Sequence, residues 1–298
     1  FDESLRADHQ HRLDIENALR EAVMSQSGEI YPVFQPIVDS RTGMVAGFEA
    51  LARWQHPRLG AVPPADFIPL AEAVGLMDRL GDLIMDRAVK ACARWNADRH
   101  VSGAPLRYVS VNLAAPQLAA PDLAARIAAI LARHGLEGAQ VRLELTESTL
   151  LAQPATAANV LQQLKALGCT AAIDDFGTGY SSFSYLQHLP VDVLKIDRSF
   201  MPDLAKEPRA RKIVAVMVDL AHALGMSVVA EGVEQPETLR EVEAIGCDFV
   251  QGYLTGRPMR FEDALVHPDG ITWPSSQLRN DDAGKAAPAA ADTRRSAP

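Results

Sequence analysis

The chain has 298 residues, 48% of them hydrophobic, which is enough apolar material for the core of one large domain or two small ones. Disorder is therefore excluded as its main property. Its 38 acidic and 29 basic residues give a formal charge of 29 − 38 = −9. Proteins that hold long nucleic acids by their phosphates usually carry the opposite sign, so we expect no long nucleic acid partner.

The cysteine pattern suits a reducing compartment, and the hydropathy pattern bears on membrane contact. Cys92, Cys169 and Cys247 form no closely spaced pair, which argues against a disulfide framework and a cysteine-based zinc cluster. The most apolar stretch, residues 213–233, is interrupted by two acids and a histidine. We therefore expect a cytoplasmic fragment without membrane contact, although the full-length protein can be membrane-anchored.

The two ends of the chain differ from its middle. Residues 1–28 are polar and helix-favouring, with Ile15, Leu19 and Val23 on one face, and are predicted to form a connecting helix. Residues 275–298 are rich in Ala, Pro, Asp and Arg and are predicted to be a disordered tail. Residues 29–274 then form one domain, and we interpret the chain as a fragment of a longer protein.

The elements of the central domain alternate between short β-branched runs and longer runs with apolar residues three or four apart. The predicted strands are 30–38, 45–54, 108–113, 141–145, 170–173, 191–196, 227–230 and 249–254, and the predicted helices are 64–74, 83–95, 121–134, 155–167, 210–224 and 236–245. Eight strands with intervening helices indicate an α/β fold of the TIM (β/α)8 barrel type. The short link at 39–44 makes the first two strands an antiparallel hairpin. A doubly wound open sheet is the alternative, but no GxGxxG follows the first strand.

Polar side chains occupy the strand ends where such a barrel has its active site. Seven successive strands contribute Glu49, Asn112, Glu144, Asp174, Asp175, Lys195, Glu231 and Gln251. Five carboxylates at one mouth repel each other strongly unless they are protonated or coordinated to a cation. Coordination to a cation explains the five neighbouring carboxylates more simply than protonation does.

The type of ligand narrows the choice of ion. Carboxylate and amide oxygens without cysteine indicate a hard cation such as Mg²⁺ or Mn²⁺ rather than zinc. The adjacent Asp174 and Asp175 suit two ions about 3.5–4 Å apart, the usual arrangement for phosphoester hydrolysis. The residues thus indicate metal-dependent phosphoester chemistry without naming a substrate. A barrel enzyme acting on carbon acids is an alternative that leaves the Asp pair unexplained.

A series of short motifs runs through residues 30–261. In order they are FQP (34–36), EALARW (49–54), FIPLAE (67–72), VNL (111–113), LELTES (143–148), DDFGTGYSS (174–182), LKID (194–197), AEGVE (230–234) and QGY (251–253). Together they resemble the EAL domains, bacterial phosphodiesterases that hydrolyse cyclic di-GMP to linear pGpG. The resemblance implies a barrel with one antiparallel strand, and in-line attack of a metal-activated water. The alternative is an inactive cyclic di-GMP receptor, but such members lose metal ligands or alter the lid.

The resemblance also implies a role for each matching residue. It assigns one divalent cation to Glu49, Asn112, Glu144 and Asp174, and a second to Asp174, Asp175 and Glu231. Lys195 resembles the lysine that orients or deprotonates the attacking water, and Glu231 resembles the candidate general base; which of them takes the proton stays open. The implied substrate contacts are Gln35, Leu51, Arg53 and Gln251.

A loop after the fifth predicted strand resembles the family's movable lid. It runs from Phe176 through Gly177, Thr178 and Gly179 to about residue 184, and the resemblance implies that Glu147 anchors it. Ser181 and Ser182 are expected to form hydrogen bonds across it. The chain departs from the family pattern at Thr255, where an aromatic residue is usual, and this position lies beyond the metal ligands.

Two expectations about partners follow from the family's common arrangements. We expect an upstream sensory or diguanylate-cyclase-like domain, because residues 1–28 suit a connecting helix. We also expect the fragment to form a homodimer whose surface is coupled to the lid.

Overall fold

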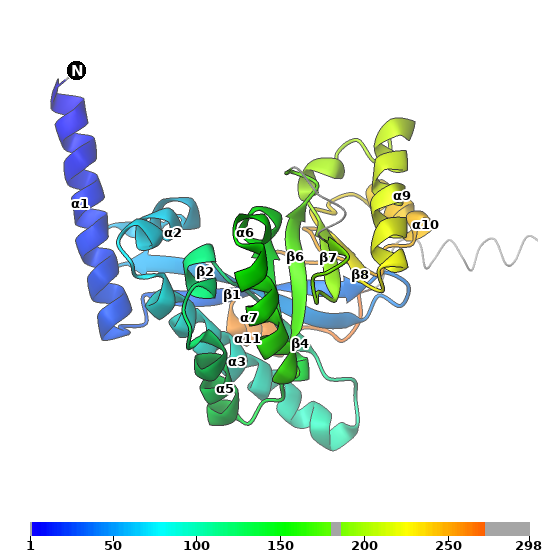
Figure 1. Cartoon of the computed structure of the whole chain (residues 1–298), viewed down its shortest axis with the longest axis horizontal. Coiled ribbons are helices and arrows are strands. Elements are labelled where there is room, and N and C mark those ends of the chain that lie inside the picture. The colour runs from blue at the N-terminus through cyan, green and yellow to red at the C-terminus, as the bar shows by residue number, and fades with distance from the viewer. Residues whose placement is uncertain (1, 180–185, 272–298) are drawn as a thin grey trace, which may run out of the picture.

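A closed eight-stranded barrel surrounded by helices forms the body of the chain (Figure 1). The computed structural model describes residues 2–179 and 186–271, with residues 2–12 described as backbone only. The strands are β1 (Ile30–Asp39), β2 (Val45–His56), β3 (Gly60–Val62), β4 (Tyr108–Asn112), β5 (Val141–Thr146), β6 (Thr170–Phe176), β7 (Val193–Ile196), β8 (Ser227–Ala230) and β9 (Phe249–Val250).

Strand pairing confirms the expected barrel type. The order β1-β9-β8-β7-β6-β5-β4-β2 closes through pairing of β1 with β2, and β3 extends β2 outside the ring. Strand β1 runs antiparallel to both of its neighbours, while the other pairs in the ring are parallel. The fold is therefore a TIM-type barrel with one antiparallel strand, and the open doubly wound sheet is excluded.

The helices cover the outside of the barrel. They are α1 (Asp2–Ser25), α2 (Pro64–Ala73), α3 (Met77–Ser102), α4 (Ala115–Leu118), α5 (Leu123–His134), α6 (Glu147–Ala152), α7 (Pro154–Ala166), α9 (Pro208–Ala223), α10 (Pro236–Ile245) and α11 (Phe261–Leu265). All six helices predicted for the central domain are present, but α3 extends well beyond 83–95 at both ends. The sequence pattern did not predict the short helices α4, α6 and α11. Each has fewer than two helical turns, which is too short to show an apolar period. No helix in the described part of the chain is long and apolar enough to cross a membrane.

Two strands end three or more residues away from their predicted positions. The last strand was expected to reach residue 254 but ends at Val250, so Gln251 lies just beyond it. The backbone turns there because the Thr255 hydroxyl accepts the Gly252 N–H at 3.2 Å. Strand β6 continues beyond its predicted end at residue 173, through the two aspartates to Phe176. Strand β8 has its predicted bounds and ends one residue before Glu231.

Side chains inside the barrel form layers, as strand alternation requires. One small apolar cluster contains Ile37, Ala172, Val193 and Val229, and it is separate from the main core between barrel and helices. The residues two positions further toward the mouth on the same strands or just beyond them are Gln35, Asp174, Lys195 and Glu231. An apolar layer therefore supports a polar layer that contains most of the predicted site.

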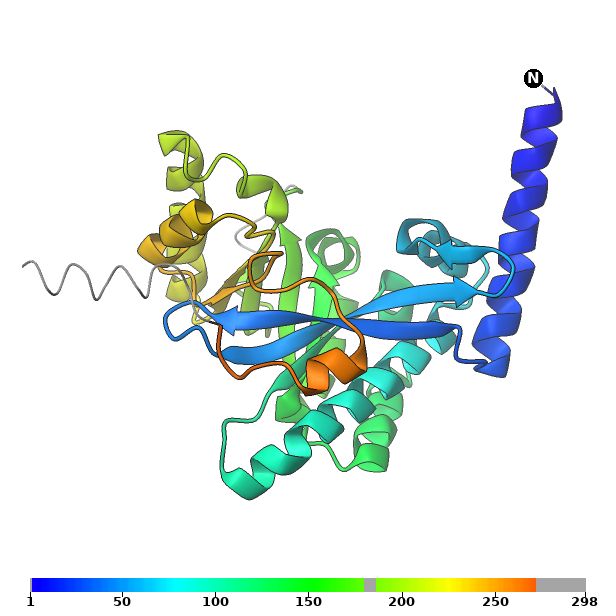
Figure 2. The ribbon, with the colours of Figure 1, turned by 180° about the vertical axis from the view of Figure 1, so that it is seen from behind.

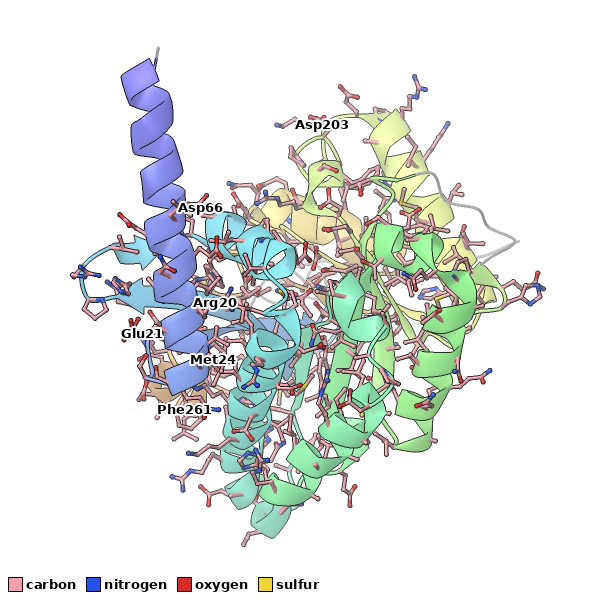
Figure 3. The ribbon with its side chains drawn as sticks, turned by 60° about the vertical axis from the view of Figure 1, so that its left-hand side comes forward. Arg20, Glu21, Met24, Asp66, Asp203 and Phe261 are labelled. Carbon is pink, nitrogen blue, oxygen red and sulfur yellow. The ribbon has the colours of Figure 1, made fainter. Side chains whose placement is uncertain are left out.

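Helix α1 packs one face against α2 and α3 and extends beyond the barrel (Figures 1 and 2). Ile15, Leu19 and Val23 are buried, as their spacing predicted. Arg20 and Met24 are exposed on the opposite side of the helix (Figure 3). Its role as a connector to another domain stays a prediction, and residues 275–298 lie outside the described residues.

The three cysteines are buried, and we predict that their thiols are inert in the folded protein. Burial raises the pKa of Cys92 and Cys247 to about 12 and that of Cys169 to about 11, so the reactive thiolate is scarce at neutral pH. A colorimetric thiol titration should detect no rapid reaction in the native protein and three thiols after denaturation. Rapid reaction of even one native thiol would contradict this packing.

Candidate active site

A single buried lysine stands at the centre of the acidic cluster. The Lys195 ammonium lies 2.6 Å from Glu144 Oε2, 2.6 Å from Glu231 Oε1, 2.8 Å from Asp174 Oδ1 and 3.7 Å from Glu49 Oε2. Its side chain is only 1% exposed, so these carboxylates replace water as its surroundings. Four strands or strand ends thus converge on one positive charge.

Neighbouring polar side chains hold two of these carboxylates in place. Asn112 Nδ2 donates to Glu49 Oε1 at 2.9 Å, and Gln251 Nε2 donates to Glu49 Oε2 at 2.6 Å. The buried Ser110 hydroxyl donates to Glu144 Oε1. We had not predicted Ser110 as a site residue, although its position two residues before Asn112 on β4 indicates the same face of the strand.

The two adjacent aspartates reach the same site because the backbone bends between them. Regular alternation would direct neighbours to opposite faces of the strand. Strand β6 has an irregular register with β7 between Ile173 and Phe176, and Asp175 has a left-handed φ of 53°. Such strain in a residue other than glycine is concentrated at functional sites. As a result Asp174, Asp175 and Glu231 each present an oxygen within 4.8 Å of the others.

The charges of the cluster are strongly coupled. Burial opposes the charge of Lys195, but the surrounding carboxylates outweigh it and raise the pKa of Lys195 well above its ordinary value. Burial raises the pKa of Glu144 well above its usual range and that of Glu231 to about 8. Burial also favours a neutral Glu49, yet Lys195 and the donors Gln251 and Asn112 lower the pKa of that carboxyl. The cluster thus contains more acidic groups than the single positive charge of Lys195 can balance.

The group Asp174, Asp175 and Glu231 has the composition of a hard-cation site. All of its donors are carboxylate oxygens, which Mg²⁺ and Mn²⁺ prefer. Asp174 Oδ1 is buried and accepts no hydrogen bond from the described residues; its only partner there is the ammonium of Lys195. Asp174, Asp175 and Glu231 therefore fit a divalent cation.

An open cleft of about 300 Å³ lies over this cluster. It is lined by Gln35, Glu49, Leu51, Arg53, Asp174, Arg198, Glu231, Gly232, Glu234, Gln251, Gly252, Tyr253 and Pro258. All four predicted substrate contacts therefore lie along one cleft, while Glu144 and Lys195 do not line it. Arg198 and the half-exposed Tyr253 were not predicted as site residues. The available signals were that Arg198 directly follows the LKID motif and that Tyr253 is the last residue of QGY.

The loop after β6 is joined to α6 through Glu147. Glu147 is the first residue of α6 and is buried, and its Oε2 accepts the Gly177 N–H at 3.2 Å. The Thr178 hydroxyl donates to the Asp175 carbonyl at 2.9 Å, and a side chain at Gly179 would lie 3.3 Å from the Glu147 carboxyl. Phe176 is a buried strand residue instead of an open loop residue. Ser181 and Ser182 lie outside the described residues.

Known proteins share this combination of sequence and fold. The EAL domain family pattern matches residues 16–258. The bifunctional diguanylate cyclase/cyclic di-GMP phosphodiesterase MucR of Pseudomonas aeruginosa is 38% identical over 266 residues, covering 89% of this chain and 38% of MucR. The cyclic di-GMP phosphodiesterase NbdA of the same organism is 38% identical over 247 residues, covering 83% of this chain and 31% of NbdA.

A solved structure extends the similarity to three dimensions. The MucR phosphodiesterase in complex with c-di-GMP has a TM-score of 0.78 at 38% identity, covering 84% of this chain and 99% of that chain. The fold and the site define a TIM-type barrel with an acidic, cation-compatible mouth. Within that class, the chain belongs to the EAL domain family. It spans less than two-fifths of the length of MucR and of NbdA.

We predict that Lys195 stabilises the metal-free protein by neutralising its carboxylates. Replacing it in Lys195→Met leaves buried acids without a counterion, which should lower the free energy of unfolding by about 3–5 kcal/mol. Because the pKa of Lys195 is raised on folding, this contribution is fully present at neutral pH, below the ordinary lysine value. Urea denaturation in EDTA measures it.

The control is Lys165→Met, which removes an exposed ion pair with Asp192 at 2.9 Å. Such a pair contributes about 0–1 kcal/mol, so the control should remain near the wild type. Equal stability of the two variants would show that Lys195 has no special electrostatic role.

Proposed function

We propose that this chain hydrolyses cyclic di-GMP to linear pGpG, using two divalent cations, Mg²⁺ or Mn²⁺. The single observation that carries the proposal is the complete acidic cluster around Lys195 beneath an open cleft. Its relatives MucR and NbdA are named cyclic di-GMP phosphodiesterases. An inactive receptor would not need to keep so costly an arrangement of buried charge.

The residues present fit the two cations. Glu49, Asn112, Glu144 and Asp174 would hold one, and Asp174, Asp175 and Glu231 would hold the other, the second group being supported by oxygens within 4.8 Å of one another. When bound, such cations offset the negative charge of the phosphodiester and acidify a water molecule. The protein's contribution is to fix these oxygens before substrate arrives, through the donors Asn112, Gln251 and Ser110.

Glu231 suits the role of proton acceptor better than Lys195. A general base needs an unprotonated atom and a pKa near the working pH. Lys195 contacts three carboxylates within 2.8 Å and its pKa is raised, so it remains an ammonium ion. Glu231 lines the cleft, and the Lys195 ammonium 2.6 Å away and a bound cation both favour its carboxylate form. We therefore assign proton acceptance to the Glu231 carboxylate, and orientation of that carboxylate to Lys195.

The cleft provides contacts for both parts of a cyclic dinucleotide. Arg53 and Arg198 are cations on its wall and suit the two phosphates. A guanidinium group can donate two parallel hydrogen bonds to the oxygens of one phosphate. Tyr253 is half-exposed at the same cleft and offers a ring face for a guanine base. Gln35 and Gln251 share a hydrogen bond of 3.3 Å on the cleft wall, and Leu51 adds apolar contact.

We further propose that the chain works as the catalytic part of a larger signalling protein. It spans 38% of MucR, whose name includes a diguanylate cyclase. The exposed face of α1 and its extension beyond the barrel are consistent with a link to an upstream sensory or cyclase-like domain and with homodimer formation.

We predict cation-dependent conversion of cyclic di-GMP to pGpG by the purified chain. The product should appear with Mg²⁺ or Mn²⁺ and be absent in EDTA. Glu49→Ala should abolish it, because Glu49 is held at the centre of the site by two amide donors and faces Lys195. Chromatographic detection of pGpG is the measurement.

The matched control is Glu237→Ala, which removes an exposed carboxylate from α10 outside this cleft. It should retain activity close to that of the wild type. If the wild type forms no pGpG although it and Glu49→Ala fold equally well, the enzyme proposal is wrong. Nucleotide binding in EDTA without turnover after Mg²⁺ is restored would establish the receptor alternative.

A further inference from the structure

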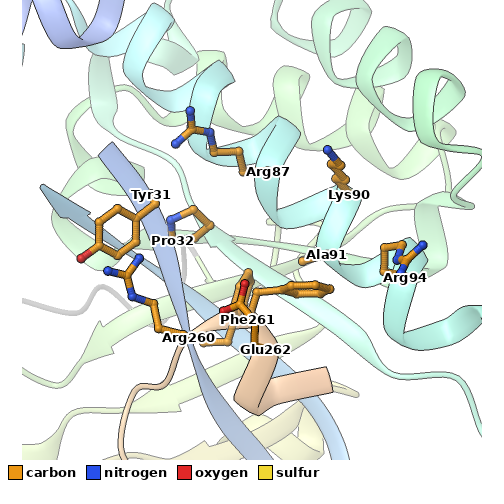
Figure 4. Close-up of a pocket in the computed structure, with 10 residues that line it drawn as sticks. Tyr31, Pro32, Arg87, Lys90, Ala91, Arg94, Arg260, Phe261 and Glu262 are labelled. Carbon is orange, nitrogen blue, oxygen red and sulfur yellow. The ribbon is translucent and has the colours of Figure 1, made fainter. Parts of the chain in front are cut away.

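A second cavity lies on the outer side of the barrel, away from the catalytic cleft. It has a volume of about 430 Å³ and is bounded by α3, the start of β1 and the start of α11 with the residue before it (Figure 4). Its lining residues are Tyr31, Pro32, Phe34, Arg87, Lys90, Ala91, Arg94, Arg260, Phe261 and Glu262. None of these lines the catalytic cleft. The volume falls within the range of small-molecule sites.

Four basic side chains surround this cavity. Arg87, Lys90 and Arg94 are spaced three and four residues apart, so they share one face of α3, and Arg260 lies on the opposite wall (Figure 4). Among the described residues none of the four is ion-paired with a carboxylate; Arg87 donates to the carbonyl of Ile30. Glu262 is the one acid on the lining. In a chain with a net charge of −9, such a group of uncompensated cations marks an anion-binding surface.

The remaining walls are aromatic and apolar. Tyr31, Phe34 and Phe261 contribute rings. Pro32 of β1 and Ala91 of α3 add apolar surface (Figure 4). The Arg260 guanidinium lies 3.7 Å from the centre of the Tyr31 ring, which holds it flat and limits its rotamers. A flat, restrained guanidinium suits paired hydrogen bonds to phosphate oxygens and stacking with a planar base.

We propose that this cavity binds a nucleoside polyphosphate. The phosphates contact the basic residues of α3, and the base packs against the aromatic wall near Arg260. Arg94 lies seven positions after Arg87 on the helix, a rise of about 10 Å, which matches a chain of phosphates better than a single phosphate. The concave shape and the ring-lined wall favour a small aromatic anion over an acidic peptide, which needs charge alone.

Calorimetric titration with ATP tests the proposal on the metal-free chain in EDTA. We expect ATP to bind, and the double variant Lys90→Glu/Arg94→Glu to bind at least about tenfold more weakly, because two attractive charges become repulsive. Inorganic pyrophosphate should also bind about tenfold more weakly than ATP, since it has no base to stack. The double variant should hydrolyse cyclic di-GMP as the wild type does.

Two control variants separate this cavity from other cationic surfaces. Arg79→Glu reverses an exposed charge on the same helix outside the cavity, and Arg53→Ala alters the catalytic cleft. Both should bind ATP within about twofold of the wild type. No ATP binding at about 1 mM, or unchanged binding by the double variant, would overturn the proposal. Binding of pyrophosphate or of a polyglutamate peptide as tightly as ATP would overturn the assignment to a nucleoside.

Discussion

One buried ammonium ion and the carboxylates around it impose the main constraint on this fold. Lys195 is nearly inaccessible to water, and four acids from separate strands or strand ends surround its Nζ atom. Removing these charges from water is costly, and their mutual attraction repays this only if each oxygen is placed accurately. Since the acids outnumber the lysine, the cluster remains electrically incomplete and favours additional cations. The buried charges therefore cost folding free energy, and they also preorganise a site for cations.

The barrel provides the accuracy that this cluster needs. An apolar layer of Ile37, Ala172, Val193 and Val229 fills the interior below the mouth and fixes the strands relative to each other. Closure through the antiparallel β1 brings Gln35 opposite Glu49 in the strand register and near Gln251. The well-packed strands thus determine where the polar side chains lie. The site also joins parts of the chain more than 200 residues apart, as the hydrogen bond from Gln251 to Glu49 shows.

Much of the fold and site followed from the sequence because both rest on periodic patterns. The predicted strands placed Glu144 and Lys195 at the barrel mouth, and the motif series assigned roles to the polar groups gathered there. The bend at Asp175 could not be predicted, because a positive φ in an aspartate leaves no pattern in neighbouring residues. The roles of Ser110 and Arg198 were missed because each depends on residues far apart in the sequence: Ser110 donates to Glu144 on the neighbouring strand, and Arg198 shares a cleft with distant segments. The outer basic cavity, too, assembles Tyr31, Arg87 and Arg260 from three separate regions.

The central claim is that the acidic mouth is completed by divalent cations, and a calorimetric titration of the metal-free chain with MnCl₂ tests it most directly. We expect two Mn²⁺ ions to bind per chain. Asp174→Asn should weaken this binding strongly, because Asp174 belongs to both proposed ligand groups. The absence of Mn²⁺ binding, or binding that Asp174→Asn leaves unchanged, would contradict the account.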